Sequence, residues 1–140
     1  MEKLEKMQDS EEEEFTTFED IFALALANTE HHRFTADSDK WHEVLYEVCE
    51  KYRDKIPQLG VIFFEERPPL PPQSNEFYQL LTTLSVSGLV SLPNPNYKYI
   101  VMEQIQKEQA QELEEKRLDK YRGYIRKITK LLDDRLAVKG

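Results

Sequence analysis

The chain has 140 residues, which suits one domain large enough to bury a core of its own. Apolar residues make up 39% and charged residues 33%, a polar composition that is still not that of a disordered chain. The net charge of −8 is unevenly spread: residues 1–50 carry 15 acids and four bases, whereas residues 116–130 hold seven bases and one acid. Such an uneven distribution of charge bears on the binding partners of the protein and not on its fold.

Several locations and chemistries are disfavoured by simple features of the chain. No apolar run approaches the roughly 20 residues that a membrane-spanning helix needs. The acidic start of the chain follows neither a secretory signal nor a transit peptide. A single cysteine, Cys49, excludes an internal disulfide and fits a reducing compartment, so a cytoplasmic protein is expected.

The first expected elements are an acidic tail and two helices. Residues 1–14 carry seven acids and few apolar residues, which favours a solvated, flexible tail. Thr16 and Thr17 offer a hydroxyl cap for a helix that fades at Asn28. After a connector at residues 31–34, Ser38 is a plausible cap for a second helix over about residues 39–54. Its apolar stripe is the cleanest in this half of the chain: Trp41, Val44, Leu45, Val48 and Tyr52.

The middle of the chain mixes a short apolar run with prolines. Residues 59–64 predict a possible buried strand, and residues 67–72 should run extended because prolines fit neither a helix nor a central strand. The segment Pro68–Pro72 could act as a ligand for an SH3-type domain, although a stiff connector packed on its own domain is the preferred interpretation.

A third helix and a hairpin follow. Ser74 caps a helix whose buried stripe is Phe77, Leu80, Leu81 and Leu84, and Gly88 suits its left-handed end. Residues 89–92 and 97–102 are β-prone and flank a Pro/Asn turn at residues 93–96, which predicts a hairpin.

Residues 103–136 contain no proline and one glycine, and predict a single long helix. In its second half, apolar residues repeat at the alternating three- and four-residue spacing of a coiled coil. This expected dimer seam consists of Leu118, Tyr121, Ile125, Ile128 and Leu132.

The stretch Glu76–Val90, closed by Tyr97–Val101, resembles the winged-helix superfamily. In that pattern, a helix with leucines at L-x-x-L spacing ends at Gly-Leu-Val, and a wing returns on a Tyr-x-Ile/Val strand. The resemblance is good over about 30 residues and loose over residues 17–102. It implies that the third helix enters a DNA major groove and that the wing contacts the backbone.

The expected DNA contacts are nevertheless unusual, because residues 74–87 contain no Lys or Arg although cations normally supply much of the affinity for DNA. Base edges could be read by Ser74, Asn75, Gln79, Thr82 and Thr83. Contacts to the DNA backbone would come from Lys98 in the wing and from cations of the long helix. The cations of the long helix fall opposite the seam: Lys120, Arg122, Arg126, Lys127 and Lys130. The same cations could simply form a solvated face, and binding to an anionic membrane surface is the least favoured of the three interpretations.

No catalytic, metal or cofactor site is predicted. The three histidines lack the spacing of a zinc site. Asp37, Asp39 and His42 could cluster, but the start of a capped helix explains them equally well. No nucleophile motif or glycine-rich phosphate loop is present in the sequence. Cys49 lies beside the apolar Val48 of a helical pattern, so a packed thiol is expected rather than a nucleophile.

The sequence therefore predicts a mainly α protein with a small β-hairpin. It divides into an acidic tail (1–14), a winged-helix-like three-helix domain (15–102) and a long C-terminal dimerisation helix (103–140). The expected function is that of a non-enzymatic, homodimeric, DNA-associated regulator without cofactor, membrane or small-molecule substrate. The alternative is a protein-interaction or adaptor module that binds no nucleic acid.

Overall fold

The computed structural model describes residues 16–92 and 98–138. It confirms the mainly helical class, with five α-helices and a two-stranded antiparallel sheet among these residues. The expected acidic tail, residues 1–14, lies outside the described part of the chain. No helix that the structure describes is both long enough and apolar enough to cross a membrane.

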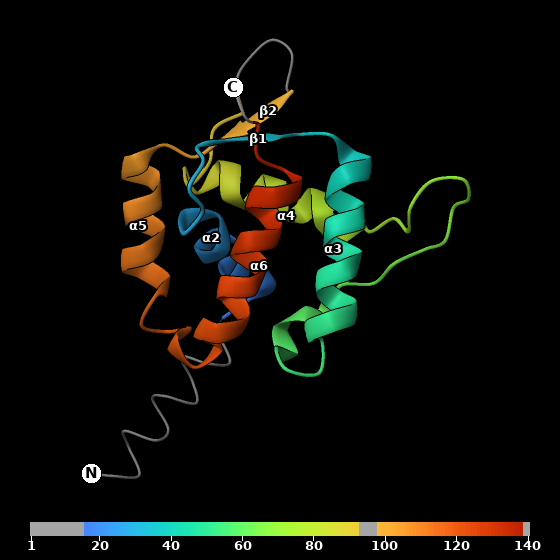
Figure 1. The fold of residues 1–140 in the computed structure, drawn as a ribbon, viewed down its shortest axis with the longest axis horizontal. Helices are drawn as coiled ribbons and strands as arrows, with labels where there is room; N and C mark the ends of the chain where they lie inside the picture. Colours follow the sequence, from blue (N-terminus) through green and yellow to red (C-terminus); the bar gives the residue numbers. More distant parts are fainter. Residues whose placement is uncertain (1–15, 93–97, 139–140) are drawn as a thin grey trace.

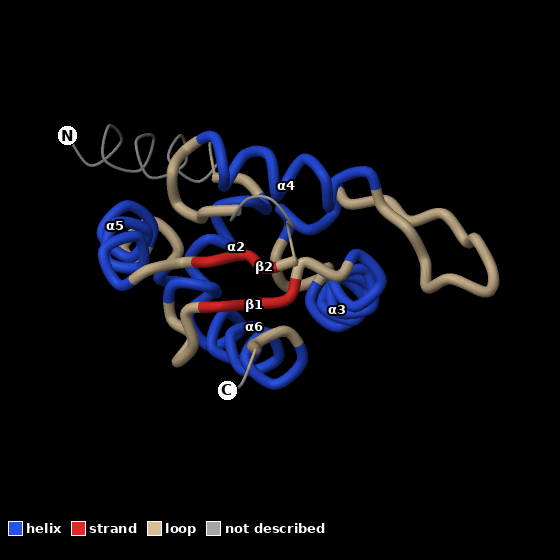
Figure 2. Tube along the Cα trace, turned by 90° about the horizontal axis from the view of Figure 1, so that it is seen from above, coloured by secondary structure: helices blue, strands red, loops and turns tan. Residues whose placement is uncertain are grey.

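The helix α2 (Phe18–Ala27) lies at the centre of the molecule (Figures 1 and 2). Nine of its ten residues are buried, because three helices pack against it: α4 (Asn75–Val86), α5 (Gln104–Glu114) and α6 (Arg122–Arg135). A helix that is apolar all round must be enclosed in this way. The cap expected at its start is confirmed at Thr17, whose backbone N–H donates to Asp20 Oδ2 at 2.9 Å in a capping box.

The expected second helix is confirmed as α3 (Ser38–Tyr52), with Trp41 and Val44 among its buried residues. The capping residue is Asp37 rather than Ser38, because the Asp37 carboxylate accepts hydrogen bonds from the backbone N–H groups of Asp39 and Lys40.

The strand expected over residues 59–64 is wrong. Pro57 starts a 3₁₀ helix, η1 (Pro57–Val61), since a proline fits the first turn of a helix. Beyond η1, successive side chains point to opposite sides, with Ile62 buried and Phe63 exposed.

The proline segment also differs from its expected extended form. Glu65 and Gln73 exchange two backbone hydrogen bonds of 2.8 and 2.9 Å, and Leu70 N–H donates to Arg67 O at 2.9 Å. The segment therefore folds back on itself as a hairpin-like loop, and it projects from the body of the molecule between α3 and α4 (Figure 1).

The third helix is confirmed as α4 (Asn75–Val86), capped by Ser74, whose Oγ accepts a hydrogen bond from Glu76 N–H. Phe77, Leu80 and Leu84 are its buried residues. Gly88 has a φ of 80°, the left-handed conformation expected after the helix.

The small sheet is assembled differently from the expected hairpin. The strand β2 (Tyr99–Val101) pairs antiparallel with β1 (Arg33–Thr35), which lies in the expected connector. Ser91 and Val101 still exchange two backbone hydrogen bonds of 2.8 and 2.9 Å, so the two predicted arms meet in a single bridge. The predicted turn between them, residues 93–96, lies outside the described residues.

The single long helix expected over residues 103–136 is also wrong. The chain forms α5 (Gln104–Glu114), a 3₁₀ turn η2 (Asp119–Tyr121) and α6 (Arg122–Arg135). Both helices pack on α2, and α6 also contacts α3. After α6 the chain returns to the sheet, where Leu136 O accepts a hydrogen bond from Thr35 N–H at 2.8 Å. The C-terminal helices thus belong to the main core instead of projecting from it.

Candidate interaction surfaces

The expected dimer seam is part of the protein's own core. All its members are buried in the single chain, with exposed fractions of 0–6%: Leu118, Tyr121, Ile125, Ile128 and Leu132. The apolar side of α6 faces α2 and α3 and is not available to a second copy. The seam therefore gives no support to dimerisation.

Four of the six cations predicted to bind a nucleic-acid backbone lie on α6, exposed on the side opposite the seam. These four form a strip at helical spacing, which we call the α6 strip: Arg122, Arg126, Lys127 and Lys130. Arg122 is paired with Asp119, and Lys120 lies outside α6 with its Nζ 4.9 Å from the Tyr121 ring centre. A hollow of about 400 Å³ beside the strip is lined by both charges, since Glu115 and Asp119 face it together with Arg122 and Arg126.

The base-edge candidates on α4 divide into two groups. Ser74, the N-cap of α4, is buried: its hydroxyl bonds Glu76 and its carbonyl lies 3.1 Å from His42 Nε2, so its polar atoms serve the fold. The other four are exposed: Asn75, Gln79, Thr82 and Thr83. Gln79 Nε2 donates to Glu19 Oε1 at 2.9 Å, which ties this side chain to α2.

The structure does not bring the two predicted halves of a DNA site together. Helices α4 and α6 lie on opposite sides of α2, as Figure 2 shows from above. Lys98 is exposed just before β2 and belongs to neither helix. A straight DNA duplex cannot contact α4 and the α6 strip of one chain at the same time.

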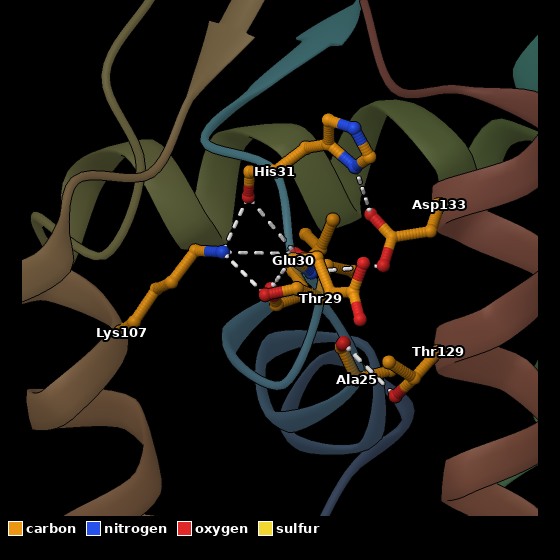
Figure 3. Close-up of polar contacts among 8 residues, drawn as sticks. Ala25, Thr29, Glu30, His31, Lys107, Thr129 and Asp133 are labelled. Carbon is orange, nitrogen blue, oxygen red and sulfur yellow. Dashed lines mark hydrogen bonds and ion pairs between the residues drawn. The ribbon is translucent and has the colours of Figure 1, made fainter. Parts of the chain in front are cut away.

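A polar cluster that the sequence did not suggest surrounds the C-terminal end of α2 (Figure 3). Lys107 on α5 is only 3% exposed, and its Nζ donates to Thr29 O at 2.7 Å, to Thr29 Oγ1 at 3.0 Å and to His31 O. Burial lowers the pKa of Lys107 from its ordinary value. An ammonium at this place satisfies carbonyls of the turn that follows α2 and complements the negative end of the helix dipole.

Helix α6 contributes to the same cluster from the opposite side. Thr129 Oγ1 donates to Ala25 O at 3.0 Å, while Asp133 accepts from Glu30 N–H at 2.8 Å and lies 2.8 Å from His31 Nδ1. These contacts use the polar atoms of the cluster to join three helices. We therefore assign it a structural role.

A buried carboxyl joins α5 to the other end of α2. Glu114 is 6% exposed, and burial raises its pKa to about 7, with the neighbouring Asp20 carboxyl adding to the shift and Arg117 opposing it. Arg117 Nη1 lies 3.3 Å from Glu114 Oε1. The arrangement places two carboxyl groups together at the start of α2.

The residues considered for catalysis or metal binding have structural surroundings. His42 is fully buried, with Nδ1 2.7 Å from Ser38 O and Nε2 3.1 Å from Ser74 O, so it links α3 to the start of α4. Cys49 is buried as expected, and burial raises its pKa to about 11, which disfavours a thiolate. Among residues 16–92 and 98–138, no three His, Cys, Asp or Glu side chains are placed to hold a metal ion.

A group of aromatic side chains, three of them exposed and Phe64 half-buried, lies where the α3–α4 connection meets both helices. We call the set of Tyr46, Phe63, Phe64 and Tyr78 the Phe63 surface. Phe63 is 71% exposed and lines two hollows, one of about 160 Å³ shared with Tyr78 and one of about 300 Å³ shared with Tyr46 and Phe64. The sequence signal for this surface was the apolar run 59–64, which was assigned to a buried strand.

Comparison with protein-family models, with curated proteins and with solved structures finds no match to this chain. Its function therefore has to be argued from its own surfaces.

Proposed function

We propose that the protein is a non-enzymatic, winged-helix-like protein-interaction module that binds a partner through α4 and the adjoining Phe63 surface. This is the alternative that the sequence left open, and the distribution of charge now favours it over DNA binding.

The element order supports a winged-helix-like arrangement. Helices α2, α3 and α4 precede a β return in which Ser91 and Val101 exchange two backbone hydrogen bonds. Gly88 follows the end of α4 at the place where the resembling pattern ends its helix at Gly-Leu-Val. In this arrangement α4 holds the position of the helix that would enter a DNA groove.

The observation that carries the proposal is the exposed side of α4. It presents Tyr78 at 53% exposure, Val86 at 83% exposure and neutral polar residues, with no Lys or Arg along its length. Phosphate attraction supplies most of the non-specific affinity for DNA, and such a surface has no cation to provide it. Exposed aromatic and aliphatic groups beside neutral polar ones are instead typical of a protein interface.

A random-peptide library displayed on phage and panned on the full chain tests the proposal. We expect enriched peptides whose affinity falls at least about tenfold with Val86→Ser or Tyr78→Ser. The matched control is Leu113→Ser, which makes the same kind of change at an exposed apolar position on α5. A library without enrichment, or peptides equally weakened by the control, would contradict the proposal.

The α6 strip supports nucleic-acid backbone binding as a second candidate function. Arg126, Lys127 and Lys130 are exposed on consecutive turns and make no ion pair with any residue that the structure describes. Fluorescence anisotropy with random duplex DNA at two salt concentrations tests this candidate. Each neutralised phosphate should contribute a slope of about −0.9 in log affinity against log salt, and Arg126→Gln with Lys127→Gln should flatten that slope. Absence of binding at low salt would exclude it.

A further inference from the structure

We propose that the Phe63 surface binds a basic peptide segment of a partner protein. An apolar side chain of that segment packs beside Phe63, and its Lys or Arg side chains face the carboxylates of Glu50 and Glu66. This inference rests on the proposed function and adds the chemistry of the partner.

The shape of the surface provides places for apolar side chains. Phe63 stands between two hollows, and its ring is left largely uncovered by the rest of the chain. Tyr78 and Asn75 of α4 border the smaller hollow, and Pro72 borders the larger one. An aliphatic or aromatic side chain entering either hollow would cover the Phe63 ring and remove apolar area from water.

The backbone on both sides of Phe63 is held in place. Arg53 Nη2 donates to Ile62 O at 2.9 Å, and Phe63 N–H donates to Glu76 Oε1 at 3.4 Å. The Phe64 ring packs edge-on against Tyr46 at 5.2 Å. Contacts to both α3 and α4 thus organise this surface before a partner arrives, which lowers the entropy cost of binding.

The charges around Phe63 select a cationic partner. Each hollow is lined by two carboxylates and one guanidinium, with Glu65, Glu76 and Arg67 around the smaller hollow. Glu50, Glu66 and Arg53 line the larger hollow.

Both guanidinium groups are already engaged. Arg67 lies 2.9 Å from Glu65, and Arg53 bonds a backbone carbonyl. Glu50 and Glu66 are exposed and have no ion pair within residues 16–92 and 98–138. Each hollow therefore keeps a formal net charge of −1, which cations of a partner would complement.

Two other occupants fit less well. A second copy would bring its own net charge of −8, and the repulsion between two such chains opposes their approach. A proline-binding domain would require Pro68–Pro72 in an extended form, whereas the hydrogen bond from Leu70 N–H to Arg67 O makes the segment turn.

The experiment uses peptides enriched from the displayed library, resynthesised with a fluorescent label and titrated with the full chain. We expect them to combine net positive charge with a large apolar residue. Replacing their Lys and Arg by Glu should weaken binding at least about tenfold, and Phe63→Ser in the protein should do the same. Glu50→Gln with Glu66→Gln should weaken binding about threefold or more and reduce its dependence on salt.

Matched controls are available on α5. Ile105→Ser removes another exposed apolar side chain, 67% exposed, and Glu112→Gln removes another exposed carboxylate. Both should leave the dissociation constant within about twofold.

Enriched peptides that are neutral or acidic, or that bind Phe63→Ser as well as the wild type, would overturn this inference. If those peptides still depended on Val86, the proposed function would stand. Sedimentation that shows self-association abolished by Phe63→Ser would identify a second copy as the occupant and would likewise overturn the inference.

Discussion

Two charged residues, Lys107 and Glu114, are buried against the central helix α2 at opposite ends. Burying a charge is costly unless the group is paired, hydrogen-bonded or neutral. Lys107 is hydrogen-bonded to carbonyl and hydroxyl oxygens, whereas Glu114 gains from remaining protonated beside Asp20. The two residues therefore respond differently to pH and to substitution.

We expect the Glu114→Gln variant to lose less free energy of unfolding than the wild type when the pH is raised. Burial raises the pKa of Glu114 from its ordinary value of 4.5 to about 7, so the folded state binds this proton more tightly than the unfolded state. Its contribution to the free energy of unfolding is then fully present below about pH 4.5 and is lost as the pH rises through about 7. Urea unfolding at pH 5 and pH 8 should show a loss about 1–3 kcal/mol smaller in the variant than in the wild type.

The exposed Glu112 supplies the control for this measurement. Glu112→Gln should change the pH dependence by less than about 0.5 kcal/mol. Equal losses in Glu114→Gln and the wild type would show that Glu114 is ionised throughout and would contradict the account.

At the scale of elements, the break between α5 and α6 lets both helices pack on α2. Side-chain contacts show the directions: Lys107 lies near the end of α2 and Glu114 near its start, while Thr129 and Asp133 follow α2 toward its end. Helix α5 thus runs antiparallel to α2, and α6 runs parallel to it. One straight helix could not bring both segments alongside α2.

We expect Lys107→Met to destabilise the fold at the C-terminal end of α2. Methionine keeps much of the apolar length but removes the donor that serves Thr29 O and His31 O. The loss should be about 2–4 kcal/mol in the free energy of unfolding, seen by thermal or urea denaturation. Lys130→Met, at an exposed position of α6, is the matched control and should cost less than about 0.5 kcal/mol. An unchanged melting temperature in Lys107→Met would contradict the capping role.

Helices with one clear apolar stripe could be predicted from the sequence. Phe77, Leu80 and Leu84 define α4, and Ser74 and Gly88 mark its ends. The break after Glu114 could not be predicted, because the connecting residues 115–118 contain neither glycine nor proline. The buried positions of α5 include a lysine and a glutamate, residues that an apolar pattern assigns to the surface.

The candidate surface was missed for a different reason. The run 59–64 is apolar throughout, and composition alone does not tell which of its side chains point outward. Only the 3₁₀ turn at Pro57 and the packing of Ile62 decide that Phe63 faces solvent. The cations of α6 could be placed on the surface because they fall opposite a clear apolar stripe.

At the scale of the whole molecule, burial of the α6 seam changes the expected oligomeric state. We expect light scattering to give the 16.6 kDa mass of one chain. Ile125 is 1% exposed, so Ile125→Asp should bury an unpaired carboxylate and abolish the helical circular dichroism signal at every concentration. A wild-type mass of about twice this value, with Ile125→Asp a folded monomer, would restore the coiled-coil dimer.

The molecule presents two chemically distinct sides about its central helix. Helix α4 and the Phe63 surface are neutral, aromatic and bordered by carboxylates, whereas the α6 strip is cationic. Because α2 separates the two sides, a ligand that occupies one leaves the other uncovered (Figure 2). The location of binding therefore distinguishes the two functional classes.

The most direct test is to map this location by backbone amide chemical shifts in the isotopically labelled full chain. Addition of an enriched library peptide should shift the amides of residues 61–66 and 75–86 and leave those of residues 122–130 unchanged. Peptide-induced shifts confined to residues 122–130 would contradict a protein-interaction module acting through α4. So would a titration in which duplex DNA shifts residues 122–130 and binds as tightly as the peptide does.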